Sequence, residues 1–174
     1  GNTLLTLINS ILDFSKLTDD KMEIVPAKYS VANVIWDVVH MTENRAQAKN
    51  LAFEVNADFR IPEFLYGDDV KLKQIVTNLL TNAIKYTERG FVTISAESYE
   101  LFVRINISDT GPGIPESEQA KIFARFYRGE AAREQEGVGV GLYLARQIVS
   151  GEGGYVKVAS TPGKGSTFSV FLPK

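Results

Sequence analysis

Two asparagines and a lysine recur at intervals of about one helical turn in the segment VTNLLTNAIKYT. Asn78 and Asn82 are four residues apart and Lys85 follows, so a helix places all three on one stripe. An asparagine oxygen is a neutral ligand suited to Mg²⁺, and a lysine ammonium suits phosphate. A solvated helix face is the alternative interpretation, although such a face gains more from Glu, Lys or Gln than from Asn.

A second polar group stands at the end of a predicted strand, in the segment ISDTGPGIP. The strand delivers Asp109, and the chain then turns through Gly111 and Gly113. Glycines let a backbone approach a ligand, and a carboxylate accepts a hydrogen bond from an amino group such as adenine N6. An ordinary Asp-Gly turn is the alternative interpretation.

A third segment, EGVGVGLYLARQIV, runs from three alternating glycines directly into an amphipathic helix. Gly137, Gly139 and Gly141 leave backbone N–H groups at the helix N-terminus available to an anion. The pattern differs from a P-loop, because no GK[ST] follows. A flexible connection is the alternative.

The elements that must position these groups follow from periodicity. Helices are predicted over 3–17, 31–49, 69–87 and 141–150, with a short helical piece over 116–126. Strands are predicted at 51–58 and in two hairpins, 91–98 with 101–109 and 155–160 with 166–173. The sum is an α+β fold, a two-layer α/β sandwich in which a mixed sheet of about five strands carries three helices on one face. An additional N-terminal helix precedes it.

Composition limits the function classes. The 19 Lys and Arg balance 21 Asp and Glu at a formal charge of −2, which argues against bulk binding of nucleic acid or of anionic membranes. No cysteine is present, and His40 is the only histidine, so thiolate metal sites, His-rich zinc sites and a Ser-His-Asp triad all lack material. No apolar stretch approaches the roughly 20 residues of a membrane span. We therefore expect a soluble, cytoplasmic chain without membrane contact, which is compatible with a membrane-anchored parent protein.

Together, the three segments resemble the ATP-binding domain of the GHKL superfamily, in particular that of sensor histidine kinases. NLLTNAIKYT resembles the N box, DTGPGIP the G1 box, KIFARFYRG the F box, GVGVGL the G2 box and GKGSTF the last glycine box. The resemblance implies a Bergerat-type fold over 28–174, preceded by a linker at 21–27. Residues 1–20 are similar to part of the second helix of the dimerisation and phosphotransfer hairpin.

The resemblance also implies roles for individual residues. Asn82 would ligate Mg²⁺ bridging the ATP phosphates, with Asn78 beside it and Lys85 toward the phosphates, and Asp109 would read the adenine amino group. The remaining implied nucleotide contacts are Tyr86, Gly111, Gly113, Ile114, Tyr127, Arg128, Gly137, Val138, Gly139, Val140, Gly141, Leu142 and Thr167. A mobile lid would span 115–140, with Phe123 and Phe126 as lid anchors or as ordinary core aromatics. Many members of the family carry threonine at the position of Val138. The difference removes a side-chain hydroxyl from the phosphate region and leaves the backbone contacts possible.

Asn78 bears on the type of reaction. Gyrase-like and chaperone-like members of the superfamily resemble one another in placing Glu one turn before the Mg²⁺-binding asparagine. An amide cannot accept a proton at neutral pH, whereas an imidazole is itself a nucleophile. Phosphotransfer assisted by Lys85 and Arg128 is therefore favoured over hydrolysis.

The acceptor of the phosphoryl group is expected outside the chain. His40 is followed by Met41 rather than an acidic residue, and we interpret it as an ordinary helix residue. The resemblance implies an upstream hairpin histidine, a homodimeric parent and relay to a response-regulator receiver domain. Two alternatives remain: a degenerate kinase that binds nucleotide as a conformational ligand, and a GHKL-type ATPase or serine kinase.

Overall fold

The computed structural model describes residues 25–124 and 141–174. The predicted N-terminal helix and most of the predicted lid lie outside these ranges. In chain order the elements are β1 (Ala27–Tyr29), α2 (Val31–Ala48), β2 (Ala52–Ala57), β3 (Leu65–Gly67), α3 (Asp69–Tyr86), β4 (Phe91–Ser98), β5 (Phe102–Asp109), α4 (Glu116–Gln119), α5 (Gly141–Gly151), β6 (Tyr155–Thr161) and β7 (Gly165–Pro173).

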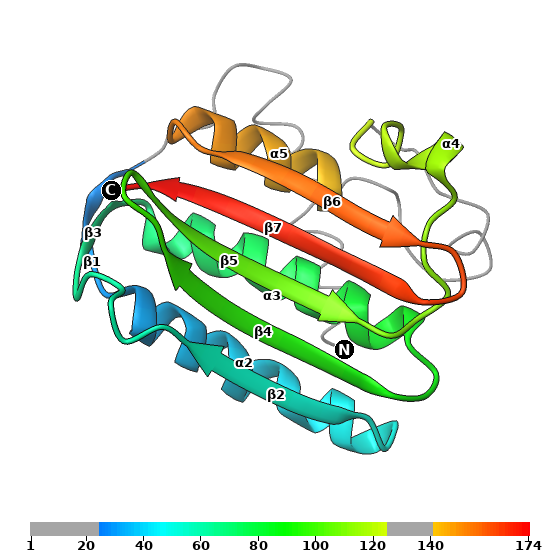
Figure 1. Ribbon diagram of the computed structural model, residues 1–174. Coiled ribbons are helices and arrows are strands. Elements are labelled where there is room, and N and C mark those ends of the chain that lie inside the picture. The colour runs from blue at the N-terminus through cyan, green and yellow to red at the C-terminus, as the bar shows by residue number, and fades with distance from the viewer. Residues whose placement is uncertain (1–24, 125–140) are drawn as a thin grey trace.

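The main sheet has five strands in the order β2-β4-β5-β7-β6 (Figure 1). β2 pairs in parallel with β4, and every other neighbouring pair is antiparallel. The two predicted hairpins and the mixed five-strand sheet are therefore confirmed. The sequence interpretation missed a second, two-stranded sheet of β1 and β3, whose three-residue strands are too short for a visible alternation.

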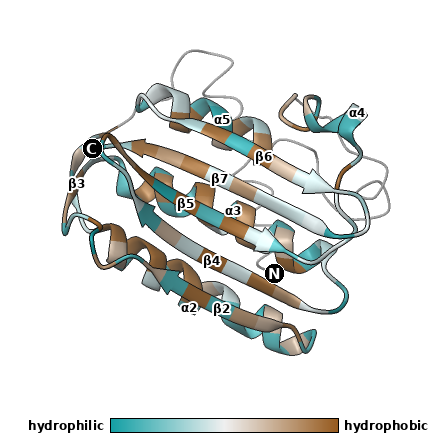
Figure 2. Cartoon of the chain, viewed as in Figure 1, coloured by the Kyte–Doolittle hydropathy of each residue, from teal (hydrophilic) through white to brown (hydrophobic). Residues whose placement is uncertain are grey.

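The three long helices α2, α3 and α5 all lie on one face of the sheet, and the opposite face carries none of the described helices (Figure 1). Hydrophobic residues recur at about every second position of β5 and along one stripe of α2, and these two patterns produce the one-sided burial (Figure 2). The predicted apolar face of α3 is confirmed, since its buried residues are Leu72, Ile75, Val76, Leu79, Leu80, Ala83 and Ile84.

The predicted helical piece over 116–126 is wrong in extent. α4 ends at Gln119, and the chain then tightens, because Lys121 N–H donates to Glu118 O at 2.9 Å and Ala124 N–H to Lys121 O at 2.9 Å. Bonds of this i to i+3 spacing belong to turns and 3₁₀ segments, and a single α-type bond, from Ile122 N–H to Glu118 O at 3.1 Å, accompanies them. In the described ranges, no helix is both long and apolar enough to cross a bilayer.

The N-terminus of α3 is held by a small network of carboxylates. Asp68 caps it by accepting from Lys71 N–H at 3.1 Å, and its other oxygen accepts from Val25 N–H at 3.0 Å. Glu152, just beyond α5, accepts from Asp68 N–H at 2.5 Å. Burial raises the pKa of Glu152. These contacts connect the start of the described chain, α3 and the end of α5.

The C-terminus of α3 is held by a lysine from the end of α2. Lys49 Nζ donates to the carbonyl oxygens of Ile84 at 2.7 Å and of Lys85 at 3.0 Å. Thr87 Oγ1 donates to Ala83 O at 2.7 Å. Helix C-termini leave such carbonyls without intrahelical partners, and a cation there also opposes the negative end of the helix dipole. Both ends of α3 are therefore fixed by neighbouring elements.

Replacing Lys49 tests this cap. Lys49→Met keeps the aliphatic stem but removes both donors, so we expect the free energy of unfolding to fall by about 1–2 kcal/mol. Urea titration followed by circular dichroism measures the change. Lys73→Met is the matched control, because Lys73 pairs at 3.0 Å with the half-exposed Asp37 and an ion pair of this kind contributes little. Equal losses in the two variants would contradict a specific role for Lys49.

Candidate functional site

Several predicted site residues meet at the end of the sheet where β5 finishes (Figure 1). Asp109 is the last residue of β5, and Gly111 lies between its carboxylate and the last turn of α3. A Cβ atom on Gly111 would lie 3.0 Å from Asp109 Oδ1 and 3.1 Å from the Tyr86 carbonyl oxygen. Only glycine allows this approach without displacing the neighbouring atoms, so the strand end and the helix end are packed together here.

The carboxyl group of Asp109 is half-buried, and this burial raises its pKa. The backbone N–H groups of Gly111 and Ser166 oppose the shift, and the Gly111 N–H donates to Asp109 Oδ1 at 2.9 Å. A carboxylate in this position is a hydrogen-bond acceptor held in one orientation beside an apolar core. It can therefore select a ligand that presents an N–H group.

The turn between β6 and β7 packs against the loop that follows Asp109. Gly113 has φ +75°, and a Cβ atom there would lie 2.3 Å from the carbonyl oxygen of Thr161. Gly165 has φ +122°, and its Cβ would lie 2.0 Å from the carbonyl oxygen of Asp109. The close backbone contacts therefore require glycine at both positions, whether or not a ligand binds nearby. The sequence interpretation explained the glycines of this region only by the approach of a ligand.

A hydroxyl network holds Ile114, one of the nucleotide contacts that the family resemblance implies. Ile114 N–H donates to Ser160 Oγ at 2.8 Å, and Ile114 O accepts from Gln119 Nε2 at 3.0 Å. Ser160 Oγ donates to Gly165 O at 2.9 Å and lies 2.8 Å from Ser166 Oγ. The sequence interpretation named none of Gln119, Ser160 and Ser166.

The structure separates Thr167 from Asp109. In the register of β5 with β7, Ser166 is opposite Asp109 and Thr167 is opposite Ser108. Thr167 Oγ1 lies 2.9 Å from Ser108 Oγ, on the face of the sheet that the helices leave uncovered. The hydroxyl residue beside Asp109 is therefore Ser166, which is buried. The period of two, counted back from the buried Val170, would have identified it.

The predicted polar stripe of α3 is present. Asn78, Asn82, Lys85 and Tyr86 are all half-buried, beside a fully apolar opposite face. Asn82 lies one turn before Tyr86, about 6 Å along the helix axis. The Lys85 ammonium lies 5.5 Å from the centre of the Tyr86 ring. The stripe thus leads along α3 to the Asp109 end of the sheet.

The remaining predicted contacts fall on α5 or outside the described residues. Gly141 begins α5, and Leu142 is partly buried against the hydrophobic core. Phe123 is buried, and its ring centre lies 6.3 Å from that of Phe168 on β7, so it is an anchor of the segment after α4. Residues outside the described ranges are Phe126, Tyr127, Arg128, Gly137, Val138, Gly139 and Val140.

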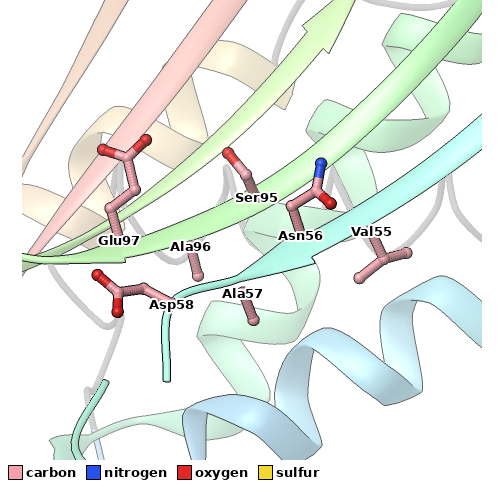
Figure 3. A pocket seen from close by; sticks show the side chains of 7 residues that line it. All are labelled: Val55, Asn56, Ala57, Asp58, Ser95, Ala96 and Glu97. Carbon is pink, nitrogen blue, oxygen red and sulfur yellow. The ribbon is translucent and has the colours of Figure 1, made fainter. Parts of the chain in front are cut away.

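A shallow depression at the β2 edge of the sheet contains none of the predicted site residues (Figure 3). Its charged groups are Asp58 and Glu97. Hydrogen bonds from Arg60 lower the pKa of Asp58 to about 2. Figure 3 also shows how side chains alternate across the sheet, with Asn56 and Ser95 on one side and Ala57 on the other. The depression does not add to the Asp109 site.

Comparison with known proteins agrees with this geometry. The family described as histidine kinase-, DNA gyrase B-, and HSP90-like ATPase matches residues 67–174. The signal transduction histidine-protein kinase BarA of Escherichia coli (strain K12) is 36% identical over 175 residues, which cover 97% of this chain. The chain belongs to the sensor histidine kinases, as their ATP-binding catalytic domain.

Solved histidine kinase structures share the fold of this histidine kinase domain. Full-length ShkA in complex with AMPPNP has a TM-score of 0.87 and 29% identity, covering 99% of this chain and 36% of that one. The catalytic domain of histidine kinase ThkA has a TM-score of 0.75 and 29% identity, covering 88% of this chain and 99% of that one. The α+β architecture is thus that of the family. The chain spans 19% of the length of BarA.

The raised pKa of Asp109 predicts that the ionised form of this carboxyl group lowers the free energy of unfolding of the histidine kinase domain. Burial disfavours the ionised form. The loss of folding stability is therefore absent below the usual aspartate pKa of about 3.9, where the group is protonated in both states, and it grows as the pH rises through the raised pKa of the folded state. We expect Asp109→Asn to raise the midpoint of thermal unfolding of the ligand-free domain at pH 7. The gain should vanish toward pH 3.5.

If Asp109 receives the adenine amino group, as the family resemblance implies, the same substitution should weaken ATP binding at least tenfold, because the amide nitrogen that replaces one carboxylate oxygen cannot accept that hydrogen bond. Calorimetric titration at pH 7 measures this loss. Asp37→Asn, on α2 and paired with Lys73 of α3, is the control for a general effect of charge. In the thermal unfolding experiment, a lower midpoint for Asp109→Asn than for the wild type at pH 7 would contradict the burial argument.

Proposed function

We propose that this chain transfers the γ-phosphoryl group of Mg·ATP to a histidine on a dimerisation hairpin upstream of it, for relay to a response-regulator aspartate. The convergence of Asp109, Gly111 and the end of α3 carries the proposal, since it forms an acceptor for an adenine amino group next to a stripe that suits phosphates. In the transfer, a nitrogen lone pair of the imidazole attacks the γ-phosphorus as the bond to the bridging oxygen breaks and ADP leaves.

The residues of α3 fit a magnesium ion. Mg²⁺ usually keeps several waters and takes one or two protein oxygens together with substrate phosphates. The described residues hold no group of three or more His, Cys, Asp or Glu side chains that could form a dedicated cage. Asn82 would supply an amide oxygen with Asn78 beside it, and Lys85 would meet the phosphates. The ion, when bound, supplies charge neutralisation for the transferred group.

Asn78 favours transfer to an imidazole over transfer to water. It occupies the position one turn before Asn82 on the same stripe of α3. An amide there cannot take the proton of an attacking water, so this domain lacks that general base. Arg128 is proposed to reach the γ-phosphate, and Tyr127, Gly137, Val138, Gly139 and Val140 to flank the nucleotide.

His40 lies away from the site, on α2. Its imidazole is half exposed and contacts the exposed Trp36 edge-on, with the ring centres 4.3 Å apart. Glu43 lies 3.5 Å from His40 Nδ1. These contacts, with one ring and one carboxylate, support the interpretation of His40 as an ordinary helix residue. The acceptor histidine is proposed to lie upstream of residues 1–20.

The proposed partners are the hairpin histidine, a second copy of the parent protein and a receiver domain. Histidine kinase ThkA was crystallised in complex with response regulator protein TrrA, which supports the last of these. A degenerate kinase that only binds nucleotide is the second candidate, and a GHKL-type ATPase or serine kinase is the third. Asn78 speaks against hydrolysis but leaves the second candidate to experiment.

Labelled ATP separates the three candidates. The chain is mixed with Mg·[γ-³²P]ATP and a separately made upstream hairpin that contains the acceptor histidine. Acid-labile, alkali-stable label on the hairpin is the expected result, because a phosphorus–nitrogen bond is hydrolysed by acid. Nucleotide binding without transfer would identify a binding module. Rapid release of phosphate by the chain alone would identify an ATPase.

Asn82→Ala tests the proposed metal ligand. Loss of the amide oxygen should remove the part of ATP affinity that depends on Mg²⁺, so that titrations with and without the ion become similar. Thr81→Ala is the matched control, since the Thr81 hydroxyl already donates within the helix, to Thr77 O at 2.7 Å. A variant at Asn82 that keeps the full Mg²⁺ dependence would show that the ion is held elsewhere.

A further inference from the structure

We propose that Ser160 is a positioning residue for base recognition: it fixes the direction of the Ser166 hydroxyl hydrogen and so favours adenine over guanine. This inference rests on the proposed adenine site at Asp109. Ser160 is the second-last residue of β6, between the loop that contains Ile114 and the first residues of β7. It is half-buried and does not belong to any of the predicted glycine boxes.

The partners of Ser160 determine how its single hydrogen is used. The Ile114 N–H can only donate, and it points at Ser160 Oγ at 2.8 Å. The Gly165 carbonyl can only accept, and it receives the Ser160 hydroxyl hydrogen at 2.9 Å. A serine hydroxyl has one hydrogen and two lone pairs. After these two bonds Ser160 Oγ retains one lone pair and no hydrogen.

The consequence falls on Ser166. Its hydroxyl oxygen lies 2.8 Å from Ser160 Oγ, and one of the two must donate to the other. Because the Ser160 hydrogen is committed to Gly165 O, the Ser166 hydroxyl donates toward Ser160. Its own lone pairs are then the only hydrogen-bonding capacity that the Ser166 hydroxyl offers to any other group. Ser166 thus becomes an acceptor, like the carboxylate of Asp109 opposite it in the register.

Two acceptors side by side discriminate between purines. Adenine presents an amino group with two hydrogens at the position where guanine presents a carbonyl oxygen. Asp109 and Ser166 can each receive a hydrogen from such an amino group, directly or through one water. Neither can donate to the guanine oxygen, which would be buried without a partner. A Ser166 hydroxyl that could rotate freely would donate to that oxygen and relax the discrimination.

Ser160 is itself held in position by a side-chain amide. Gln119 Nε2 donates to the carbonyl oxygens of both Ile114 and Ser160 at 3.0 Å. The amide thus ties the strand residue to the loop residue that bonds its hydroxyl. This cross-link keeps the Ile114 N–H pointed at Ser160, which the argument on hydrogen direction requires.

The test compares ATP with GTP in the folded domain. We expect Ser160→Ala to lower the ratio of ATP to GTP affinity about fivefold, the size of one neutral hydrogen bond of about 1 kcal/mol. Calorimetric titration with each nucleotide gives the ratio. Ser160→Thr keeps the hydroxyl and should keep the ratio. Ser160→Cys, close in size to serine, serves if the alanine variant does not fold, and should lower the ratio because a thiol is a weak donor and acceptor.

A double-mutant cycle shows whether Ser160 acts through Ser166. In a Ser166→Ala background, Ser160→Ala should leave the ATP to GTP ratio unchanged, whereas a merely structural effect would persist and overturn the proposal. Ser169→Ala, on the other face of the same strand, where the Ser169 hydroxyl donates to Asn106 Oδ1 at 2.7 Å, is the control and should not alter the ratio. An unchanged ratio in Ser160→Ala also overturns it. A wild-type chain with no affinity for ATP would instead refute the adenine site itself.

Discussion

The packing of α3 against the sheet is the constraint on which the site depends. The apolar face of this helix is almost completely buried, so the helix has one possible rotation about its axis, and a turn of even 100° would bring charged groups into the core. That rotation is what directs Asn78, Asn82 and Lys85 to the same side. Lys49 and Asp68 then fix the position of the helix along its axis by holding its two ends. The hydrophobic core and the polar stripe are two results of one packing arrangement.

The second requirement is close backbone packing at the end of β5. Three chain segments approach each other there so closely that a Cβ atom on Gly111, Gly113 or Gly165 would collide with carbonyl or carboxylate oxygens. This density leaves Asp109 partly removed from water and raises its pKa. A carboxylate in open solvent would discriminate poorly between ligands, because water competes for every hydrogen bond. The destabilising burial of this group and the selectivity proposed for it therefore have the same cause.

Much of the fold was predictable because it depends on local periodicity. The 3.6-residue period of α2 and α3 and the two-residue alternation of β4 and β5 are strong signals, and the structure confirms them. Short β1 and β3 carry too few residues to show a period, and α4 ends early because most of the backbone bonds that follow it span i to i+3. In the site, residues within glycine-rich motifs were accessible from sequence. Ser160 and Gln119 were not, because their importance comes from contacts with segments distant in the chain. Thr167 was named as a nucleotide contact, and Ser166 was not, because the motif was matched without counting the alternation of the strand.

The parallel pairing of β2 with β4 has a consequence for the order in which the chain folds. Ala52 is paired with Phe91, and the whole of α3 lies between them in the sequence. The hairpins of β4 with β5 and of β6 with β7 close over short turns, whereas β2 can add to the sheet only after a long crossover has been closed at an entropic cost. During synthesis, β2 leaves the ribosome before the strand that it must join. It therefore spends that interval unpaired, and the polar Glu54 and Asn56 that alternate with its apolar residues resist pairing with another chain.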